Sequence, residues 1–325
     1  MKFQNIAKGV SVKPSAIKSL KHTDAIIFDC DGVLVDVSKS YDLAIKQTTS
    51  YILKKFLNIK SIEISPQIIS NFKATGGFND EVDVTYASIL SLVAAKRLGV
   101  NPKKFIAKVI GNADSTGIVS VEKFLDTTSV DISDIRKKLK FPGPHLTNPL
   151  YQIFDQIFYG QHLYKKIFHK KSNFKSKGLI ENDKVLVTKQ LLDSLENNFE
   201  QKISIVTGRG KESVKYSLTE LFSRFDIKSS VFLEDHPRKL AKPNPKSLLM
   251  SINSLDSQSC IYVGDSMEDL IMANKTKKLG KKTLFCGIYG TAPDPISKKK
   301  FFEKNNADII LESIRLLPKA LNLAN

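Results

Sequence analysis

Two carboxylates follow directly after a short apolar run near the start of the chain. In the stretch AIIFDCDGVLVD (25–36), Asp29 and Asp31 stand one residue apart, and Asp36 follows. Asp and Gly are common turn residues, so an acidic turn after a strand is one explanation. Carboxylates placed this closely repel each other unless a cation lies among them. The spacing therefore also fits a site that holds a metal ion and uses a carboxylate in chemistry.

Three later stretches place polar or charged residues beside other apolar runs. They are ISIVTGR (203–209), LAKPNP (240–245) and IYVGDSMED (261–269). In open parallel sheets, ligands bind outside the carboxyl ends of the strands, so we expect these stretches to meet Asp29 at one edge of a sheet. The side chains and backbone positions that they bring are Thr207, Gly208, Arg209, Lys242, Asp265 and Asp269.

The chemistry of this set is coherent. Carboxylate oxygens that leave room for water and for a phosphate of the substrate suit Mg²⁺. A hydroxyl from Thr207, backbone amides at the turn that follows it and the amine of Lys242 suit an anion with several oxygens. Phosphoryl transfer is catalysed mainly by positioning and by charge neutralisation, so the set favours that reaction.

The elements that must position these residues can be predicted from the apolar pattern. Apolar runs of strand length occur at 25–28, 203–206, 230–233, 261–264, 283–286 and 308–311. From Ile203 onward they alternate with helical patterns at 211–225 and 268–280. This alternation predicts an α/β fold with a doubly wound, Rossmann-like parallel sheet that helices cover on both faces.

The middle of the chain has a different pattern. Amphipathic helices are predicted at 41–57, 81–99, 121–125, 148–168 and 182–199, and strand signals are scarce. We therefore predict a large, mainly helical domain inserted after the first strand. The predicted boundaries are 1–22 for an N-terminal extension, 23–36 and 201–325 for the α/β core, and 37–200 for the insertion.

Composition narrows the possible partners and location. The chain of 325 residues has an ordinary apolar content of 42% and only three cysteines, which are widely spaced. It shows neither a signal peptide nor a membrane-spanning run, and a reducing cytoplasm fits best. The net charge of +17 favours anionic partners. Because the lysines are scattered and no nucleic-acid-binding motif is present, we expect a small phosphorylated metabolite rather than nucleic acid.

Taken together, the four stretches resemble the motifs of the haloacid dehalogenase superfamily, in the order in which that family has them. DCDGVLVD is similar to the first motif, VTGR to the second and VGDSMEDLIMA to the fourth. AKPNP resembles the third, although Ala241 stands where Gly is more usual. The resemblance covers roughly half of the chain, and it implies that the insertion is what this family calls a cap.

The resemblance also implies a role for each matching residue. Asp29 would be the nucleophile that forms an aspartyl-phosphate, and Asp31 the general acid and base. Thr207 and the amide of Gly208 would hold phosphoryl oxygens, while Lys242 would offset negative charge. Mg²⁺ would be bound by Asp29, by the backbone carbonyl of Asp31 and by Asp265, with Asp269 in an outer position. Members that cleave carbon–halogen bonds need no second Asp, so the presence of Asp31 favours a phosphoryl substrate.

Some roles remain open at this stage. Arg209 could contact substrate or form a surface ion pair, and Asp269 could also serve to start a helix. In TGGFND (75–80), Phe78 and Asn79 could face the substrate, or Asn79 or Asp80 could simply cap the following helix. This stretch and GLIENDKVLV (178–187) resemble a phosphoglycolate-phosphatase-like subgroup with an enlarged helical cap.

The leading hypothesis is thus a Mg²⁺-dependent phosphatase that acts on a small phosphorylated metabolite. A phosphotransferase of the sugar phosphomutase kind shares all four motifs and is the first alternative. A protein that binds anions or nucleic acid without catalysis is the second. This second alternative is less favoured, because the sequence keeps every carboxylate of the motifs.

Overall fold

The apolar runs at the two ends of the chain form one eight-stranded sheet in the order β1-β2-β10-β9-β8-β3-β6-β7. The computed structural model describes residues 3–59, 63–78, 80–145 and 147–322. From β10 to β7 all neighbouring strands are parallel, and β1 and β2 pair antiparallel at one edge. The predicted α/β class with a mostly parallel sheet is confirmed. The strands are β1 (Gln4–Ala7), β2 (Val10–Val12), β3 (Ala25–Phe28), β6 (Ile203–Thr207), β7 (Val231–Phe232), β8 (Ser259–Gly264), β9 (Lys282–Ile288) and β10 (Ile309–Leu311).

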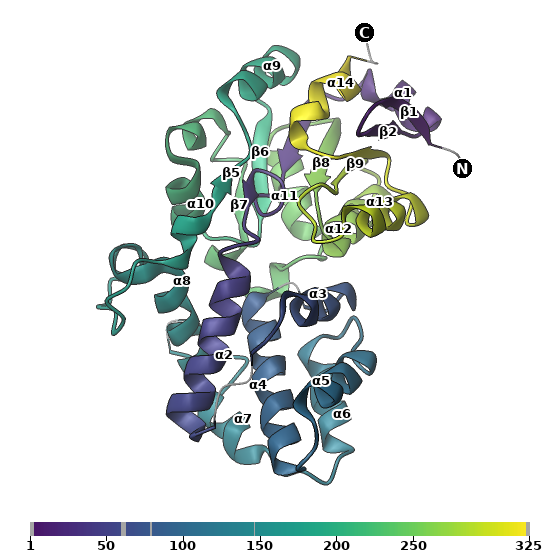
Figure 1. Cartoon of the computed structure of the whole chain (residues 1–325). Coiled ribbons are helices and arrows are strands. Elements are labelled where there is room, and N and C mark those ends of the chain that lie inside the picture. Colours follow the sequence, from purple (N-terminus) through teal and green to yellow (C-terminus); the bar gives the residue numbers. More distant parts are fainter. Residues whose placement is uncertain (1–2, 60–62, 79, 146, 323–325) are drawn as a thin grey trace. The chain divides into compact units, whose positions relative to one another are not determined.

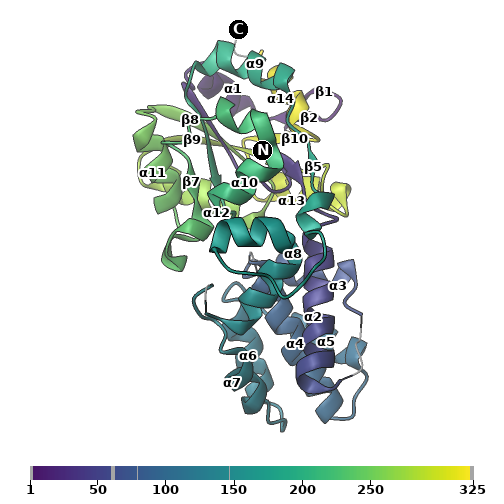
Figure 2. The same ribbon diagram turned by 90° about the vertical axis from the view of Figure 1, so that its left-hand side faces the viewer.

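Helices cover both faces of this sheet because its central strands are apolar on both sides (Figures 1 and 2). Ile26 and Phe28 of β3 belong to the core on one face, and Ala25 and Ile27 to the core on the other. The first core includes residues of α1 (Pro14–Leu20), α9 (Lys189–Phe199), α10 (Lys211–Leu218) and α14 (Leu317–Leu321). The second includes residues of α11 (Lys246–Ser254), α12 (Met267–Lys278) and α13 (Pro295–Lys304).

Short elements complete this α/β unit. A separate two-stranded antiparallel ladder joins β4 (Val35–Asp36) to β5 (Lys184–Val185). Short 3₁₀ helices lie between the larger elements, at η2 (Thr219–Arg224), η3 (Leu233–Asp235), η4 (Arg238–Leu240) and η5 (Ile314–Leu316).

The N-terminal residues are part of the sheet, which differs from the extension predicted for residues 1–22. β2 pairs with β10, and the side chains of Val10 and Val12 are buried. α1 packs against the same core through Ala16 and Leu20. Strands of three and four residues leave too short an alternation to be recognised in the sequence, which is why this edge was not predicted.

The middle of the chain forms a separate helical unit that spans Lys39–Asn182. α4 is buried on all sides from Val82 to Ala95, polar residues such as Asp83 and Ser88 included, so it lacks the exposed polar face of the amphipathic helix predicted here. It packs against α2, α5, α6 and α8 of the same unit. The helices are α2 (Tyr41–Leu57), α3 (Pro66–Ala74), α4 (Glu81–Arg97), α5 (Pro102–Gly111), α6 (Ile118–Asp126), α7 (Ser133–Leu139), α8 (Pro149–Phe168) and the 3₁₀ turn η1 (Leu179–Asn182).

The helical insertion ends earlier than the predicted boundary at 200. The α/β unit consists of Met1–Ser38 and Asp183–Asn325, and the helical unit of Lys39–Asn182. The segment 182–199 was predicted as one helix, but it contains β5 and then α9. α9 packs its buried Leu192 and Leu195 into a core of the sheet. An amphipathic pattern shows that a helix has a buried face, but not which domain buries it.

A second departure from the predicted helices occurs inside α8, which was expected to be continuous. Gly160 has φ 68° and ψ 176°, so the helix is kinked there. A Cβ at this position would lie 2.2 Å from the backbone nitrogen of Gly178, and Gly160 forms a bridge with Lys177. Only glycine permits both this backbone conformation and the close approach of the second chain segment.

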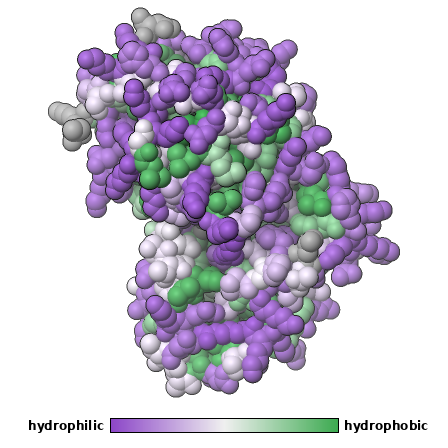
Figure 3. Space-filling model, turned by 180° about the vertical axis from the view of Figure 1, so that it is seen from behind, coloured by the Kyte–Doolittle hydropathy of each residue, from purple (hydrophilic) through white to green (hydrophobic). Residues whose placement is uncertain are grey.

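One face of the molecule is mainly hydrophilic (Figure 3), in keeping with the high content of lysine and arginine. Hydrophilic side chains cover most of the face in Figure 3, and hydrophobic side chains form only small separate areas on it. Among the described helices, none combines the length and the apolar character needed to cross a membrane.

All three cysteines are free thiols buried in the α/β unit, and burial raises their pKa. For Cys260 the pKa rises from 9.0 to about 12. The unfolded chain would therefore release these protons at a lower pH than the folded chain. By linkage, the stabilising effect of a neutral buried thiol is complete below pH 9 and is lost as the pH rises toward 12.

We expect the free energy of unfolding to fall between pH 9 and 12, with about 1.4 kcal/mol per pH unit from each buried thiol. Urea unfolding at a series of pH values measures this slope. Cys260→Ala should reduce the slope by about the contribution of one proton. An unchanged slope in this variant would contradict the assignment.

Candidate active site

A buried lysine joins two of the predicted carboxylates. Asp29 directly follows β3, and the Nζ of Lys242 lies 2.8 Å from its Oδ1. The same Nζ lies 2.7 Å from Oδ1 of Asp269, which is fully buried near the start of α12. β3 and β8 are neighbouring parallel strands, so the segments that follow them emerge at the same edge of the sheet. The structure thus brings together three residues that are far apart in the sequence.

Burial and charge act in different directions on these three groups. Burial raises the pKa of Asp29 well above its usual range. Lys242 acts against this increase, and the neighbouring carboxylates of Asp269, Asp31 and Asp265 add to it. Burial opposes the charge on Lys242, but Asp269 and Asp29 raise its pKa. Lys242 and several hydrogen bonds lower the pKa of Asp269 despite its burial. A positive charge beside Asp29, in addition to that of Lys242, would favour the ionised form of its carboxyl group.

Asp265 provides a place for that charge. Carboxylate oxygens of Asp29, Asp265 and Asp269 all lie within 4.8 Å of one another. Asp265 is partly exposed, whereas the other two are buried, so a cation could reach the group from the side of Asp265. Donors that are all carboxylate oxygens suit a hard divalent cation, and this set therefore fits a metal site.

Asp269 is the least suited of the three to bind a metal directly. Its Oδ1 accepts hydrogen bonds from the hydroxyl of Tyr262 at 2.7 Å and from Lys242. Its Oδ2 accepts from the backbone of Asp265 and from the backbone and hydroxyl of Ser266, in a capping box at the start of α12. Asp269 thus starts a helix, as the sequence allowed, and at the same time holds Lys242 and the Asp265 loop in place.

Asp31 points toward a different partner. Its Oδ1 lies 2.6 Å from Nε of Arg209, whose side chain is only 1% exposed. Arg209 also lies 2.8 Å from Asp183 through Nη2. The ion pair that the sequence suggested does form, but it is buried rather than on the surface. The guanidinium is therefore occupied by protein carboxylates, which does not favour the predicted contact with substrate.

The turn after β6 offers an open backbone position. Thr207 is buried at the end of the strand, and its Oγ1 accepts a hydrogen bond from the backbone of Arg209 at 3.3 Å. Gly208 is exposed, and a Cβ placed on it would have no atom within 4 Å. Its carbonyl accepts a hydrogen bond from the backbone of Glu234. An oxyanion could therefore approach this backbone without a steric barrier.

Gly32 has a strict steric role beside the carboxylates. Its φ of +71° is disfavoured for other residues, and a Cβ at this position would lie 2.3 Å from Oδ2 of Asp265. The carbonyl of Gly32 also accepts a hydrogen bond from the hydroxyl of Thr291 at 2.9 Å. The glycine therefore allows the loop after Asp29 to pass directly over the carboxylate of Asp265.

Phe78 and Asn79 were predicted to bind substrate, and the structure describes only the first of them. Phe78 is buried, and its ring centroid lies 5.0 Å from that of Phe72, so its side chain is part of a packed core. Asn79 lies outside the described residues. Asp80 caps α4 by accepting a hydrogen bond from the backbone of Val82, as the simpler explanation of this stretch proposed.

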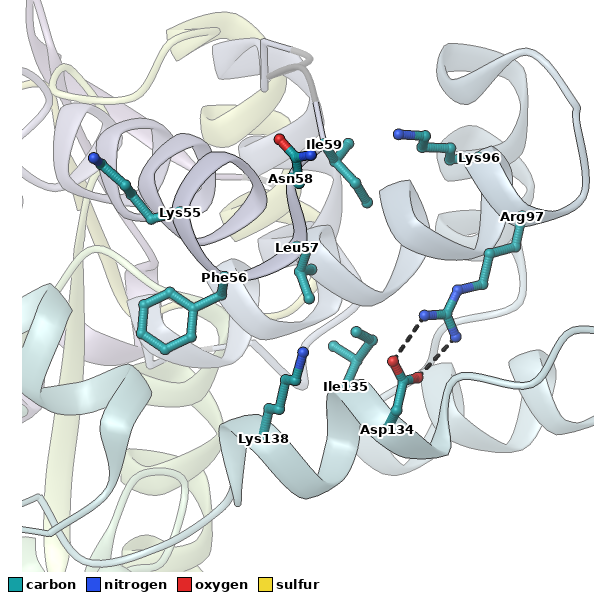
Figure 4. Close-up of a pocket in the computed structure, with 10 residues that line it drawn as sticks. All are labelled: Lys55, Phe56, Leu57, Asn58, Ile59, Lys96, Arg97, Asp134, Ile135 and Lys138. Atoms are coloured by element: carbon teal, nitrogen blue, oxygen red, sulfur yellow. Dashed lines mark hydrogen bonds and ion pairs between the residues drawn. The ribbon is translucent and has the colours of Figure 1, made fainter.

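The helical unit has a surface pocket of its own, with a volume of about 520 Å³ (Figure 4). Its lining comes from the ends of α2, α4 and α7, and includes no residue of the four motifs. Arg97 is held by both carboxylate oxygens of Asp134 at 2.8 and 2.9 Å. The remaining basic side chains at the pocket are Lys55, Lys96 and Lys138.

Sequence reasoning missed three residues that support the site. Tyr262 lies within the apolar run of β8, where an aromatic residue is an ordinary strand former, so its hydroxyl gave no signal. Asp183 belongs to the stretch 178–187, which resembles a subgroup of the family but indicates no role for this carboxylate. Ser217 of α10 accepts a hydrogen bond from Nη1 of Arg209 and donates one to Asp183. No pattern in the sequence pointed to it.

We expect Gly32→Ala to displace the carboxylate of Asp265 and to weaken the binding of a divalent cation by about tenfold or more. The physical reasons are the steric overlap of the new Cβ and the positive φ. Titration calorimetry with Mn²⁺ measures the affinity. Gly111→Ala is a matched control, because its Cβ would meet no atom within 4 Å. Equal affinity in the Gly32 variant and the wild type would contradict this role.

We expect Phe78→Ala to lower the free energy of unfolding by about 3–5 kcal/mol, since it removes a buried ring. Chemical denaturation measures the loss. A substrate contact predicts something else, namely unchanged stability together with a raised KM. That second result would show that Phe78 does not act mainly through packing.

Two solved structures share the fold of this chain. The phosphatase Tt82 from Thermococcus thioreducens has a similar structure, with a TM-score of 0.53 and 22% identity over 83% of this chain and 94% of that chain. A structural genomics target has a TM-score of 0.61 and 17% identity over 92% of this chain and 98% of that chain. At these identities the likeness shows the shared fold alone.

A curated relative matches only part of the chain. Imidazoleglycerol-phosphate dehydratase from Phytophthora nicotianae is 27% identical over 139 residues, which are 41% of this chain and 30% of that protein. The chain therefore spans less than a third of the length of this relative.

The family model of the haloacid dehalogenase-like hydrolases matches residues 23–275. The matched stretch contains Asp29, Thr207, Lys242 and Asp265, and it takes in well over half of the chain. The protein therefore belongs to the haloacid dehalogenase-like hydrolases.

Proposed function

We propose that the protein is a Mg²⁺-dependent phosphatase that hydrolyses a small phosphorylated metabolite through an aspartyl-phosphate on Asp29. The observation that carries this proposal is the contact of Asp29 with Lys242 beside the carboxylate of Asp265. A nucleophilic carboxylate, a fixed ammonium and a cluster of oxygen donors for a cation are the parts that phosphoryl transfer requires.

In the first step, one carboxylate oxygen of Asp29 forms a bond to phosphorus while the bond between phosphorus and the leaving oxygen breaks. Asp31 gives its proton to that leaving oxygen, which departs as an alcohol. In the second step, Asp31 takes a proton from water, and the water oxygen forms a bond to phosphorus while the bond between phosphorus and the oxygen of Asp29 breaks. Inorganic phosphate leaves, and the carboxylate of Asp29 is restored.

The positive charges have separate tasks in this scheme. Lys242 neutralises part of the charge that gathers on Asp29 and the phosphoryl group. Asp29, Asp265 and the backbone carbonyl of Asp31 would hold Mg²⁺, with Asp269 orienting the loop from behind. When bound, the cation would favour the ionised form of Asp29 and neutralise charge on the phosphoryl oxygens.

The phosphoryl oxygens that do not face the cation would lie at the turn after β6. The hydroxyl of Thr207 and the backbone amide of Gly208 are the donors that we assign to them. This assignment is supported by the open space at Gly208. We do not assign a substrate contact to Arg209, because Asp31 and Asp183 occupy its guanidinium.

We expect Asp29→Asn to reduce phosphate release to below about one-thousandth of the wild-type rate, because an amide is a very poor nucleophile. Wild-type activity should also disappear with a chelator and return with Mg²⁺. A screen of phosphorylated metabolites that includes phosphoglycolate, with detection of free phosphate, measures both effects. Asp193→Asn on α9 is a control, since its half-exposed carboxylate pairs with Arg224 outside the site.

The same screen tests the alternatives. Appearance of an isomeric sugar phosphate in place of free phosphate would favour the phosphomutase. Salt-dependent retention on nucleic acid, with no turnover of any phosphate ester, would favour a binding protein and would refute the proposal.

A further inference from the structure

The most completely buried cation of the α/β unit, among the residues described, is Arg209. Its guanidinium forms one ion pair through Nε and hydrogen bonds through Nη1 and Nη2. Nε lies 2.6 Å from Asp31, Nη2 lies 2.8 Å from Asp183, and Nη1 donates to Ser217 at 2.9 Å. Arg209 follows Thr207 and Gly208, so it directly adjoins the turn that we assign to the phosphoryl group.

Asp183, where the chain returns from the helical insertion, forms an ion pair with Arg209. Its side chain is 4% exposed, and it is the first residue of the α/β unit after the helical insertion. Ser217 of α10 donates a hydrogen bond to the same carboxylate oxygen that faces Arg209. The next residues of the chain form β5, which pairs with β4. The segment that follows the insertion is therefore joined to the segment that follows Asp29, both by the β4–β5 pairing and by the ion pairs of Arg209.

The ion pair between Arg209 and Asp31 differs from the pair with Asp183 in the exposure of its carboxylate. A buried guanidinium needs hydrogen-bonded, charged partners, and Asp183 is already such a partner. Asp31, by contrast, has a side chain that is 28% exposed. A carboxylate with this much freedom would sample several rotamers unless it were held. The contact with Arg209 selects one of them, in which one carboxylate oxygen is fixed.

We propose that Arg209 is a positioning residue that holds the carboxyl group of Asp31 in place for proton transfer to the leaving oxygen, and that Asp183 holds Arg209. This inference rests on the proposed phosphatase function. Arg209 does not itself touch the substrate in this scheme. The consequence is that the first residue after the insertion contributes to catalysis through two successive ion pairs.

The dependence of the rate on the leaving group tests this role. An alkoxide is a poor leaving group and must be protonated as it departs, whereas p-nitrophenolate leaves without a proton. The parameter kcat/KM covers the steps up to the departure of the leaving group. A loss of proton donation should therefore reduce kcat/KM for an alkyl phosphate far more than for p-nitrophenyl phosphate.

We expect Arg209→Gln to lower kcat/KM about 10- to 100-fold for the best alkyl phosphate of the screen, and less than about fivefold for p-nitrophenyl phosphate. Asp183→Asn should show the same preference with a smaller loss for the alkyl ester. A purely structural role predicts equal losses for the two esters. Equal losses in both variants, or no loss at all, would overturn the proposal.

Matched controls separate this effect from general destabilisation. Arg224→Gln removes another paired arginine of the α/β unit, which contacts Asp193 and Glu196, and it should leave the ratio of the two rates unchanged. Thermal unfolding shows whether each variant is folded. If Arg209→Gln does not fold, Asp183→Asn decides, because it keeps the arginine. If the wild type hydrolyses neither ester, the proposed function itself is wrong, and this inference is wrong with it.

Discussion

The site depends on one ammonium group that is buried between two carboxylates. The Nζ of Lys242 lies within 2.8 Å of both Asp29 and Asp269, and all three residues are almost completely removed from solvent. Removing one member of such a set leaves an uncompensated buried charge, which is far more destabilising than the loss of a surface ion pair. The two carboxylates and the lysine are therefore held together by electrostatics as much as by the sheet.

The rest of the α/β unit delivers these charges to the same place. β3 and β8 run in parallel with Phe28 opposite Val263, so the acidic segments that follow both strands leave the sheet side by side. Behind them, the hydroxyl of Tyr262 supports Asp269, and Gly32 allows its loop to approach Asp265. Strand register, a capping box and one glycine thus hold the carboxylates in an arrangement that could bind a cation.

Much of this arrangement could be predicted because it depends on local patterns. The strands that end at or directly before Asp29, Thr207 and Asp265 are apolar runs, and the helices α2 and α4, of seventeen residues each, begin at the residues predicted for them. The convergence of the four motifs followed from the rule for parallel sheets. Helices α3 and α5 were missed, although each begins with a capping residue followed by proline, at Ser65 and Asn101.

What could not be predicted depends on contacts between distant residues. The partners of Arg209 and the hydroxyl contact of Tyr262 are decided by tertiary packing, and no short pattern encodes them. The buried position of Phe78 is a result of the same kind, because a Gly-Gly turn before a helix is compatible with an exposed or a packed aromatic ring. Short strands such as β5 escaped notice because two residues carry no periodicity.

The ladder between β4 and β5 has a consequence for how this architecture can vary. Val35 lies opposite Val185 and Asp36 opposite Lys184, so the chain leaves and re-enters the α/β unit at directly adjacent positions. The ends of any inserted segment are thus already brought together, and the entropy of closing a longer loop grows only slowly with its length. Relatives could therefore exchange, enlarge or shorten the intervening domain by recombination without altering the strand order of the sheet.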